Sequence, residues 1–240
     1  MSKLIDTHFH LDHYRNHPDV FKTINKMEQY TLCVTNSPGV FLSCKNMYPE
    51  TKYIKFALGA HPCEINKTSI IKEFEYCIEK SKYIGEIGLD FSKKYEETKA
   101  LQIEVFNEII KLGVKYNKLM SIHSKKSEDK LIEILQKYKP NRCIIHWFNG
   151  SKDQFNELIK LGCYFSVNYN MIGEFGNSDY LKNIPKNKIL IESDGPYAKV
   201  KGKKFKPEML KEIYYEVGNR LDIQNLDKVV FNNFKEILTL

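Results

Sequence analysis

Short apolar runs alternate with longer amphipathic segments along the whole chain. The runs are rich in Ile, Val, Leu, Phe and Tyr and mostly lack a strict polar alternation, which is typical of β-strands that are buried on both faces. They predict eight strands, at residues 4–9, 31–36, 53–59, 82–87, 119–123, 142–147, 163–168 and 188–193.

Helical spacing of apolar residues fills several of the intervals between these runs. In residues 96–116, Leu101, Val105 and Ile109 share one face of a helix. The motif Ser151-Lys-Asp-Gln154 is a capping box, which is typical of a helix N-terminus. Further helices are predicted at residues 127–138, 151–161, 207–220 and 225–238.

Eight strands that alternate with helices predict an α/β protein, a single-domain (β/α)8 TIM barrel that spans residues 1–240. The structural alternative is an open, doubly wound sheet. That fold usually carries a glycine-rich phosphate loop after its first strand, whereas this chain carries the sequence His8-Phe-His10 there. The barrel is therefore the favoured interpretation.

Composition narrows the class of protein. No apolar run approaches the roughly 20 residues of a membrane span, and Met1-Ser-Lys-Leu-Ile has no signal-peptide core, so we expect a cytoplasmic protein without a membrane partner. The six cysteines include no Cys-x-x-Cys pair, and a disulfide framework is not expected. The net charge of +7 favours polyanionic partners such as nucleic acid, and only three of the 37 basic residues are Arg, so most phosphate contacts would come from Lys.

Histidines gather at the predicted strand ends. In TIM-barrel enzymes the chemistry lies at the C-terminal ends of the strands. Acidic side chains end two of the strands as well, with Glu86 on the fourth and Asp194 after the eighth. Five of the seven histidines fall at such ends: His8, His10, His61, His123 and His146. The pattern predicts that these side chains share one site.

The residue types suit two divalent metal ions. His8 and His10 lie two residues apart on a strand and so point to the same face, where they would hold one ion together with Asp194. His123 and His146 would hold the second ion.

Glu86 is the predicted bridge between the ions, because a carboxylate has two oxygens to share. Imidazole and carboxylate ligands suit Zn, Mn, Fe or Co, and Mg with more water in its shell, so Mg, Mn and Zn are the leading candidates. Two ions about 3.5–4 Å apart can activate water and stabilise both oxygens of a phosphoryl displacement.

The ordered motifs resemble those of the TatD family of metal-dependent deoxyribonucleases. The likeness rests on His8-Phe-His10, Gly59-Ala-His61-Pro, Gly85-Glu86-Ile-Gly-Leu-Asp90, His123, His146-Trp-Phe-Asn-Gly and Glu192-Ser-Asp194-Gly-Pro-Tyr197. The resemblance implies an amidohydrolase-like TIM barrel that hydrolyses DNA phosphodiesters, often as a 3′→5′ exonuclease. Its partner would be DNA, as a single strand or a 3′ end, and this chain would be a short, divergent member.

The resemblance also assigns roles to residues. It implies that the metal ligands are His8, His10, Glu86, His123, His146 and Asp194. Asp194 would also orient or deprotonate the attacking water, and His61 matches a histidine that contacts the substrate. The expected catalytic residues are therefore Asp194, Glu86 and His61.

Three departures from the family pattern bear on the substrate. Lys125 stands where the family usually has Arg, and Trp147 replaces the usual Cys. Trp147 would either stack on a base or pack in the wall of the site. Gly195 follows Asp194 where Ala or Ser is usual, and Tyr197 is expected to line the pocket.

A lysine-rich segment follows the last predicted strand. Residues 199–206 contain five lysines in eight positions, at the mouth of the expected site. Lys203 and Lys204, with Lys206, would attract a nucleic-acid backbone; alternatively the segment is a solvated loop. Asp90 would either orient a metal-binding histidine or cap the next loop.

Two other functions remain open at this stage. One is an amidohydrolase-type esterase or deacylase that acts on an ester, lactone, amide or aminoacyl-tRNA. Many related barrels bridge their metals with a carboxylated Lys on the fourth strand, and Glu86 at that place favours the nuclease. The other is a nuclease or nucleic-acid-binding subunit of a prokaryotic antiphage assembly, so the chain would act as a monomer or within a larger complex.

Overall fold

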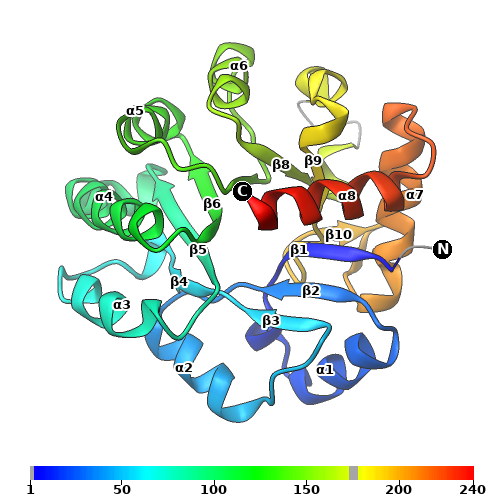
Figure 1. Ribbon diagram of the computed structural model, residues 1–240, viewed down its shortest axis with the longest axis horizontal. Coiled ribbons are helices and arrows are strands. Elements are labelled where there is room, and N and C mark those ends of the chain that lie inside the picture. Colours follow the sequence, from blue (N-terminus) through cyan, green and yellow to red (C-terminus); the bar gives the residue numbers. More distant parts are fainter. Residues whose placement is uncertain (1–2, 173–177) are drawn as a thin grey trace. The chain divides into compact units, whose positions relative to one another are not determined.

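The structure of this protein is a computed structural model that describes residues 3–172 and 178–240 (Figure 1). The contacts between residues divide the chain into two compact units. The first unit comprises Met1–Cys33, Glu50–Lys55 and Phe165–Thr239, and the second comprises Val34–Pro49 and Phe56–Tyr164.

The first unit contains the start and the end of the chain. Strand β1 (Ile5–Phe9) pairs in parallel with β2 (Tyr30–Cys33), which lies next to β3 (Ile54–Phe56). Strands β8 (Tyr164–Val167) and β9 (Ile189–Ile191) form a second parallel pair. The helices of this unit are α1 (His17–Lys26), α7 (Leu210–Leu221) and α8 (Leu226–Thr239).

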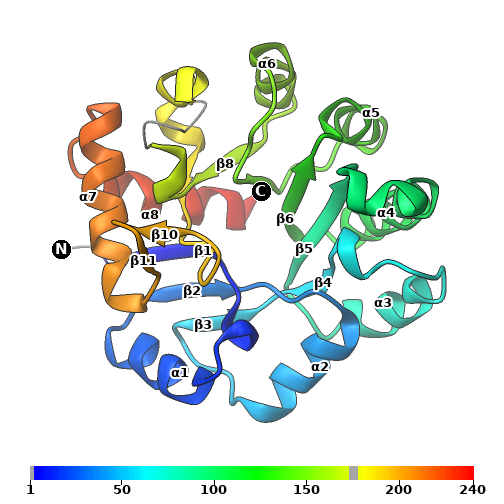
Figure 2. The same ribbon diagram turned by 180° about the vertical axis from the view of Figure 1, so that it is seen from behind.

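A short hairpin completes the first unit. It consists of β10 (Lys199–Val200) and β11 (Lys203–Lys204), and both views place it beside β1 and α7 (Figures 1 and 2). The Lys201 and Gly202 residues of the turn both have positive φ, at 49° and 75°. The Lys201 ammonium forms ion pairs with Glu212 and Glu216 of α7, so this lysine of the segment is neutralised within the protein.

The second unit is a parallel sheet covered by helices. Its strands follow one another in sequence order, and the helices α3, α4 and α5 lie outside them (Figure 1). Ile84, Ile87 and Ile122 of the strands have no solvent exposure, as expected for strands buried on both faces. The strands are β4 (Leu58–Ala60), β5 (Tyr83–Asp90), β6 (Leu119–Lys125) and β7 (Cys143–His146), and the helices are α2 (Pro38–Met47), α3 (Ile70–Ile78), α4 (Lys99–Lys115), α5 (Glu128–Tyr138) and α6 (Lys152–Lys160).

Local sequence signals explain where several elements begin and end. The Ser151 hydroxyl accepts a hydrogen bond from the Gln154 amide at 3.2 Å, and the Gln154 side chain accepts one from the Ser151 amide at 2.8 Å. This capping box starts α6 at the residue the sequence indicates. In the first unit, the Asn233 side-chain amide of α8 donates to the Lys186 carbonyl at 2.7 Å and to the Ile189 carbonyl at 2.8 Å.

The prediction of one strand at 53–59 is wrong. The segment forms two strands, β3 and β4, that belong to different sheets. The Thr35 hydroxyl lies at the break, where it donates to the Ala57 carbonyl at 2.8 Å and accepts from the Gly59 amide at 3.1 Å. A side chain therefore satisfies backbone groups that a continuous strand would give to its neighbour.

The other predicted strands are present, with ends that lie within three residues of the predicted ones. Three helices in the structure, α1, α2 and α3, were not among the predicted ones. Two of them begin with Pro at the first or second helical position, a start signal that the apolar spacing alone does not use. Within the described part of the chain, no helix has the length and apolar character needed to cross a membrane.

Candidate metal centre

The first cluster of possible metal ligands lies at the end of β1. The Nε2 atoms of His8 and His10 are 3.3 Å apart, as expected for residues that point to the same face of a strand. The Asp194 carboxylate, just beyond β9, lies 3.5 Å from His10 Nε2 and 3.8 Å from His8 Nε2. All three residues are buried. We call His8, His10 and Asp194 the β1 cluster.

The spacing of these donor atoms fits a divalent metal. A tetrahedral ion with metal–ligand distances near 2.0–2.1 Å holds its donors about 3.3–3.5 Å apart. Two of the three distances in the β1 cluster fall in this range, and the third is 3.8 Å. Two imidazoles and a carboxylate are also the ligand types that such ions take.

Backbone and side-chain hydrogen bonds fix the β1 cluster. The Asp194 amide donates to the His8 carbonyl at 3.0 Å, and the His10 amide donates to the Gly195 carbonyl at 2.9 Å. Below them, the buried Asp6 carboxylate accepts from the Ser193 amide at 2.9 Å and from the Ser193 hydroxyl at 2.6 Å. Burial raises the pKa of Asp6 to about 7, against the opposing effect of these hydrogen bonds. Asp6 therefore couples β1 to the residue that precedes Asp194.

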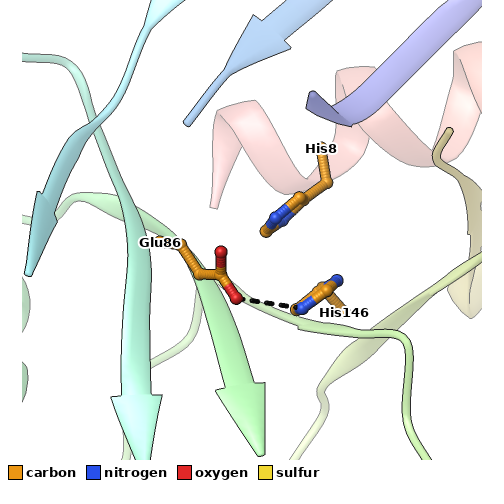
Figure 3. Close-up of side chains that lie close together, drawn as sticks. All are labelled: His8, Glu86 and His146. Atoms are coloured by element: carbon orange, nitrogen blue, oxygen red, sulfur yellow. Dashed lines mark ion pairs between the residues drawn. The ribbon is translucent and has the colours of Figure 1, made fainter. Parts of the chain in front are cut away.

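The second cluster, in the second unit, is built around one carboxylate oxygen. Glu86 Oε1 lies 2.9 Å from His123 Nδ1, 3.1 Å from His146 Nε2 and 3.4 Å from His61 Nε2. Figure 3 shows the Glu86 carboxylate directed at the His146 ring. We call Glu86, His61, His123 and His146 the Glu86 cluster.

The charge of Glu86 and burial act in opposite directions on the pKa values of the neighbouring histidines. Burial lowers the pKa of His61, but the charge of Glu86 and the hydrogen bonds with Cys63 and Glu86 together outweigh burial and raise this pKa. Burial likewise lowers the pKa of His123, and its contacts with Asp90 and Glu86 outweigh burial and raise it. Each ring can meet Glu86 through an N–H donor or through a cation that they share, and imidazole and carboxylate ligands suit a divalent metal.

Two features of β5 and β6 hold His123 beside Glu86. Gly88 allows close approach of the strands, since a Cβ atom there would lie 2.0 Å from the His123 carbonyl oxygen. Asp90 Oδ2 lies 3.7 Å from His123 Nε2, and Asp90 Oδ1 accepts from the Ser92 amide at 2.8 Å. Burial raises the pKa of Asp90, but its interactions with His123 and Ser92 outweigh burial and lower this pKa. Asp90 therefore both faces the histidine and caps the next loop.

The match to known families decides the identity of the chain. A model of the family described as TatD related DNase matches residues 5–239. This chain belongs to the TatD family. It is 28% identical, over 99% of each chain, to a protein of Buchnera aphidicola from Acyrthosiphon pisum that is described as an uncharacterized metal-dependent hydrolase. It is 27% identical to the deoxyribonuclease Tat-D of Schizosaccharomyces pombe, over 60% of this chain and 52% of the other.

Solved structures show the same fold. The TatD homolog YjjV of Escherichia coli K12 matches with a TM-score of 0.86 and 21% identity, over 99% of this chain and 98% of the other. An uncharacterized amidohydrolase of Saccharomyces cerevisiae matches with a TM-score of 0.82 and 16% identity, over 99% and 100% of the two chains. The chain thus has the α/β TIM-barrel fold of these proteins, and it is a metal-dependent hydrolase of the TatD family.

The structure places His13 next to the β1 cluster of this TatD-family chain. The His13 ring stacks on His10 with centroids 4.9 Å apart and planes 11° apart. The Tyr197 hydroxyl lies 2.6 Å from His13 Nδ1, and the Asp12 carboxylate lies 3.3 Å from His13 Nε2. His10, Asp12 and His13 could themselves hold a cation. Sequence reasoning left His13 out because it lies beyond the strand, although its spacing from His10 was a usable signal.

The remaining predicted substrate contacts are accessible to different degrees. Lys125, Lys203 and Lys204 are exposed, Trp147 is partly buried, and Tyr197 is 56% exposed. Glu192 is fully buried and accepts a hydrogen bond from the Asn168 side chain at 2.9 Å, which gives it a structural role.

Proposed function

We propose that this TatD-family hydrolase is a cytoplasmic DNase that cleaves DNA phosphodiester bonds, acting as a 3′→5′ exonuclease on single strands or 3′ ends. The observation that carries the proposal is the Glu86 cluster, in which the carboxylate of a glutamate, rather than that of a carboxylated lysine, lies beside three imidazoles. The net charge of +7 supports a polyanionic substrate.

The proposed cofactors are two divalent ions, chosen among Mg, Mn and Zn. When bound, such ions act as Lewis acids on the phosphate and lower the pKa of water. His8, His10 and Asp194 would hold one of them, and Glu86, His123 and His146 the other. The predicted role of Glu86 as a bridging ligand rests on the sequence and the family resemblance.

The other roles follow from the chemistry of the side chains. The Asp194 carboxylate orients the attacking water and accepts its proton. His61 and Lys125 bind the scissile phosphate, His61 as a hydrogen-bond donor through Nε2 and Lys125 as an exposed point charge. Trp147 and Tyr197 contact the bases, and Lys203 and Lys204 attract the backbone.

A nuclease assay on end-labelled single- and double-stranded DNA tests the proposal, with Mg, Mn and Zn compared. We expect stepwise shortening from the 3′ end, lost in Glu86→Ala and retained in the partly exposed control Glu157→Gln. Cleavage by a metal-stripped Glu86→Ala protein would refute the assignment. Ester, lactone and amide substrates belong in the same panel, because turnover of these without DNA cleavage would establish the esterase or deacylase alternative.

A further inference from the structure

A cavity of about 460 Å³ opens in the first unit, beside the β1 cluster. It lies between the loop after β1, the first turns of α1 and the segment after β11. Its volume is in the range of sites that take small molecules or cofactors. Among its lining residues are His13, Tyr14, Arg15, Asp19, Thr23, Lys204, Lys206 and Glu208.

Charges of both signs line this cavity. Arg15, Lys204 and Lys206 supply three exposed cations, whereas Asp19 and Glu208 supply two exposed carboxylates. The cations suit a phosphate group, and the carboxylates suit hydrogen-bond donors such as amino groups of a base or hydroxyls of a sugar.

An aromatic wall makes the cavity a built feature of the fold. Tyr14 is only 6% exposed, and its hydroxyl donates to the Phe205 carbonyl at 3.0 Å. The Tyr14 ring stacks on Phe9 at 5.3 Å, and the Lys204 ammonium lies 5.2 Å from the centroid of the Tyr14 ring. Tyr14 thus positions one of the cations and ties the first loop to the segment after β11.

This wall depends on Gly195, at which the chain departs from the usual family pattern. A Cβ atom there would lie 2.5 Å from the Phe205 ring, 2.6 Å from the Tyr14 hydroxyl and 2.9 Å from the Phe9 ring. Contacts below 3.0 Å force atoms to move, so the aromatic wall requires the glycine. Gly195, which stands where Ala or Ser is usual, therefore makes room for the aromatic wall of the cavity.

His13 connects the cavity to the proposed reaction site. The His13 side chain lines the cavity and also stacks on the predicted ligand His10, with ring centroids 4.9 Å apart. A group in the cavity is therefore separated from the β1 cluster by about the thickness of one ring.

From this geometry we infer that the cavity binds a nucleotide unit of the DNA strand, next to the nucleotide that is cleaved. The inference rests on the proposed function. The phosphate of that unit contacts Arg15, Lys204 and Lys206, and its base donates hydrogen bonds through N–H groups to Asp19 and Glu208. A polyphosphate fits less well, because the two carboxylates would repel its additional charge.

Binding of thymidine 5′-monophosphate to the metal-loaded, full-length protein tests the site directly. We expect Lys204→Ala/Lys206→Ala to raise the Kd at least tenfold. The matched control is Lys22→Ala/Lys26→Ala, which removes two exposed lysines of α1 that do not line the cavity and should change the Kd less than twofold. Thr23→Trp fills the cavity without altering charge and should also weaken binding at least tenfold. Wild-type affinity in both cavity variants would overturn the inference.

Kinetics identify the source of the nucleotide. For Thr23→Trp, kcat/KM on a single-stranded oligonucleotide should fall at least tenfold more than kcat/KM on bis(4-nitrophenyl) phosphate, which has no neighbouring nucleotide. An equal fall on both substrates would overturn the assignment to the DNA strand. If the wild-type protein cleaves no DNA, the proposed function fails, whereas the monophosphate titration still decides whether the cavity binds a nucleotide.

Discussion

The β1 cluster and the Glu86 cluster use similar residues in opposite arrangements. In the β1 cluster, two imidazoles from one short strand lie 3.3 Å apart and a carboxylate completes the set at 3.5 and 3.8 Å. In the Glu86 cluster, one carboxylate oxygen lies within 3.4 Å of three imidazoles, each from a different strand end.

The difference separates two ways of making a metal site. The β1 cluster depends on local strand geometry, because residues i and i+2 share a face whatever the rest of the chain does. The Glu86 cluster depends on a central negative charge, and the neighbouring strands only have to deliver rings to it. Removal of the carboxylate should therefore harm the two clusters unequally.

Glu86→Gln should have the largest effect. The amide carries no charge to hold a cation among three imidazoles, so DNA cleavage should fall by at least about 10³-fold. Metal analysis by mass spectrometry should show the loss of one ion per chain, and Glu157→Gln at a partly exposed position of α6 is the control. Unchanged metal content would contradict the central role given to Glu86.

Asp194→Asn tests the other cluster. The two histidines of β1 remain, so some metal should still bind there, but the carboxylate that accepts the proton of water is lost. We expect cleavage to fall by about 10²–10³-fold. Steady-state kinetics on an oligonucleotide measure the effect, with the exposed Asp153→Asn as control. A rise in KM with an unchanged kcat would argue against the proposed proton transfer.

A smaller effect is expected at the residues that hold each cluster in place. Asp6→Asn should weaken metal affinity of the β1 cluster, and Asp90→Asn that of the Glu86 cluster, each by about 10–100-fold. Titration of activity with Mn measures the affinity, and excess metal should restore most of the rate. Failure of added metal to restore the rate in either variant would point to a direct catalytic role.

The smallest effects are expected for substitutions of the glycines beside the two clusters. Gly195→Ala and Gly88→Ala both place a Cβ atom against atoms less than 3.0 Å away, and each should lower the free energy of unfolding by about 1–3 kcal/mol. Gly39→Ala in α2 is the control, since its nearest neighbour lies 3.9 Å away. Urea denaturation measures the difference. Equal stability of all three variants would show that the close approaches are relieved without cost.

The fold class was predictable from the sequence because buried parallel strands leave continuous apolar runs. The family was predictable from the TatD motifs. Residues 53–59 form a similar apolar run in which Lys55 is the one charged residue. Nothing in its pattern reveals that the Thr35 hydroxyl interrupts it. The ion pairs of Lys201 with Glu212 and Glu216 were equally hidden, because they depend on how the hairpin turns back onto α7.

The candidate site divides in the same way. His8 and His10 were predictable as a pair from their spacing alone. The approach of His61 to Glu86 depends on how β4 and β5 pair, and the cavity beside His13 depends on Gly195, Tyr14 and Phe205. No local pattern encodes such contacts, since each joins residues that are distant along the chain.

The hydrogen bonds of Asn233 have a consequence for synthesis of the protein on the ribosome. This residue of α8 satisfies the Lys186 and Ile189 carbonyls at the start of β9, the strand that leads to Asp194. A nascent chain makes His8 and His10 first and Asp194 nearly two hundred residues later, and α8 follows only after that. The strand that leads to the third ligand of the β1 cluster thus gains these hydrogen bonds only after the segment that contains α8 has been made.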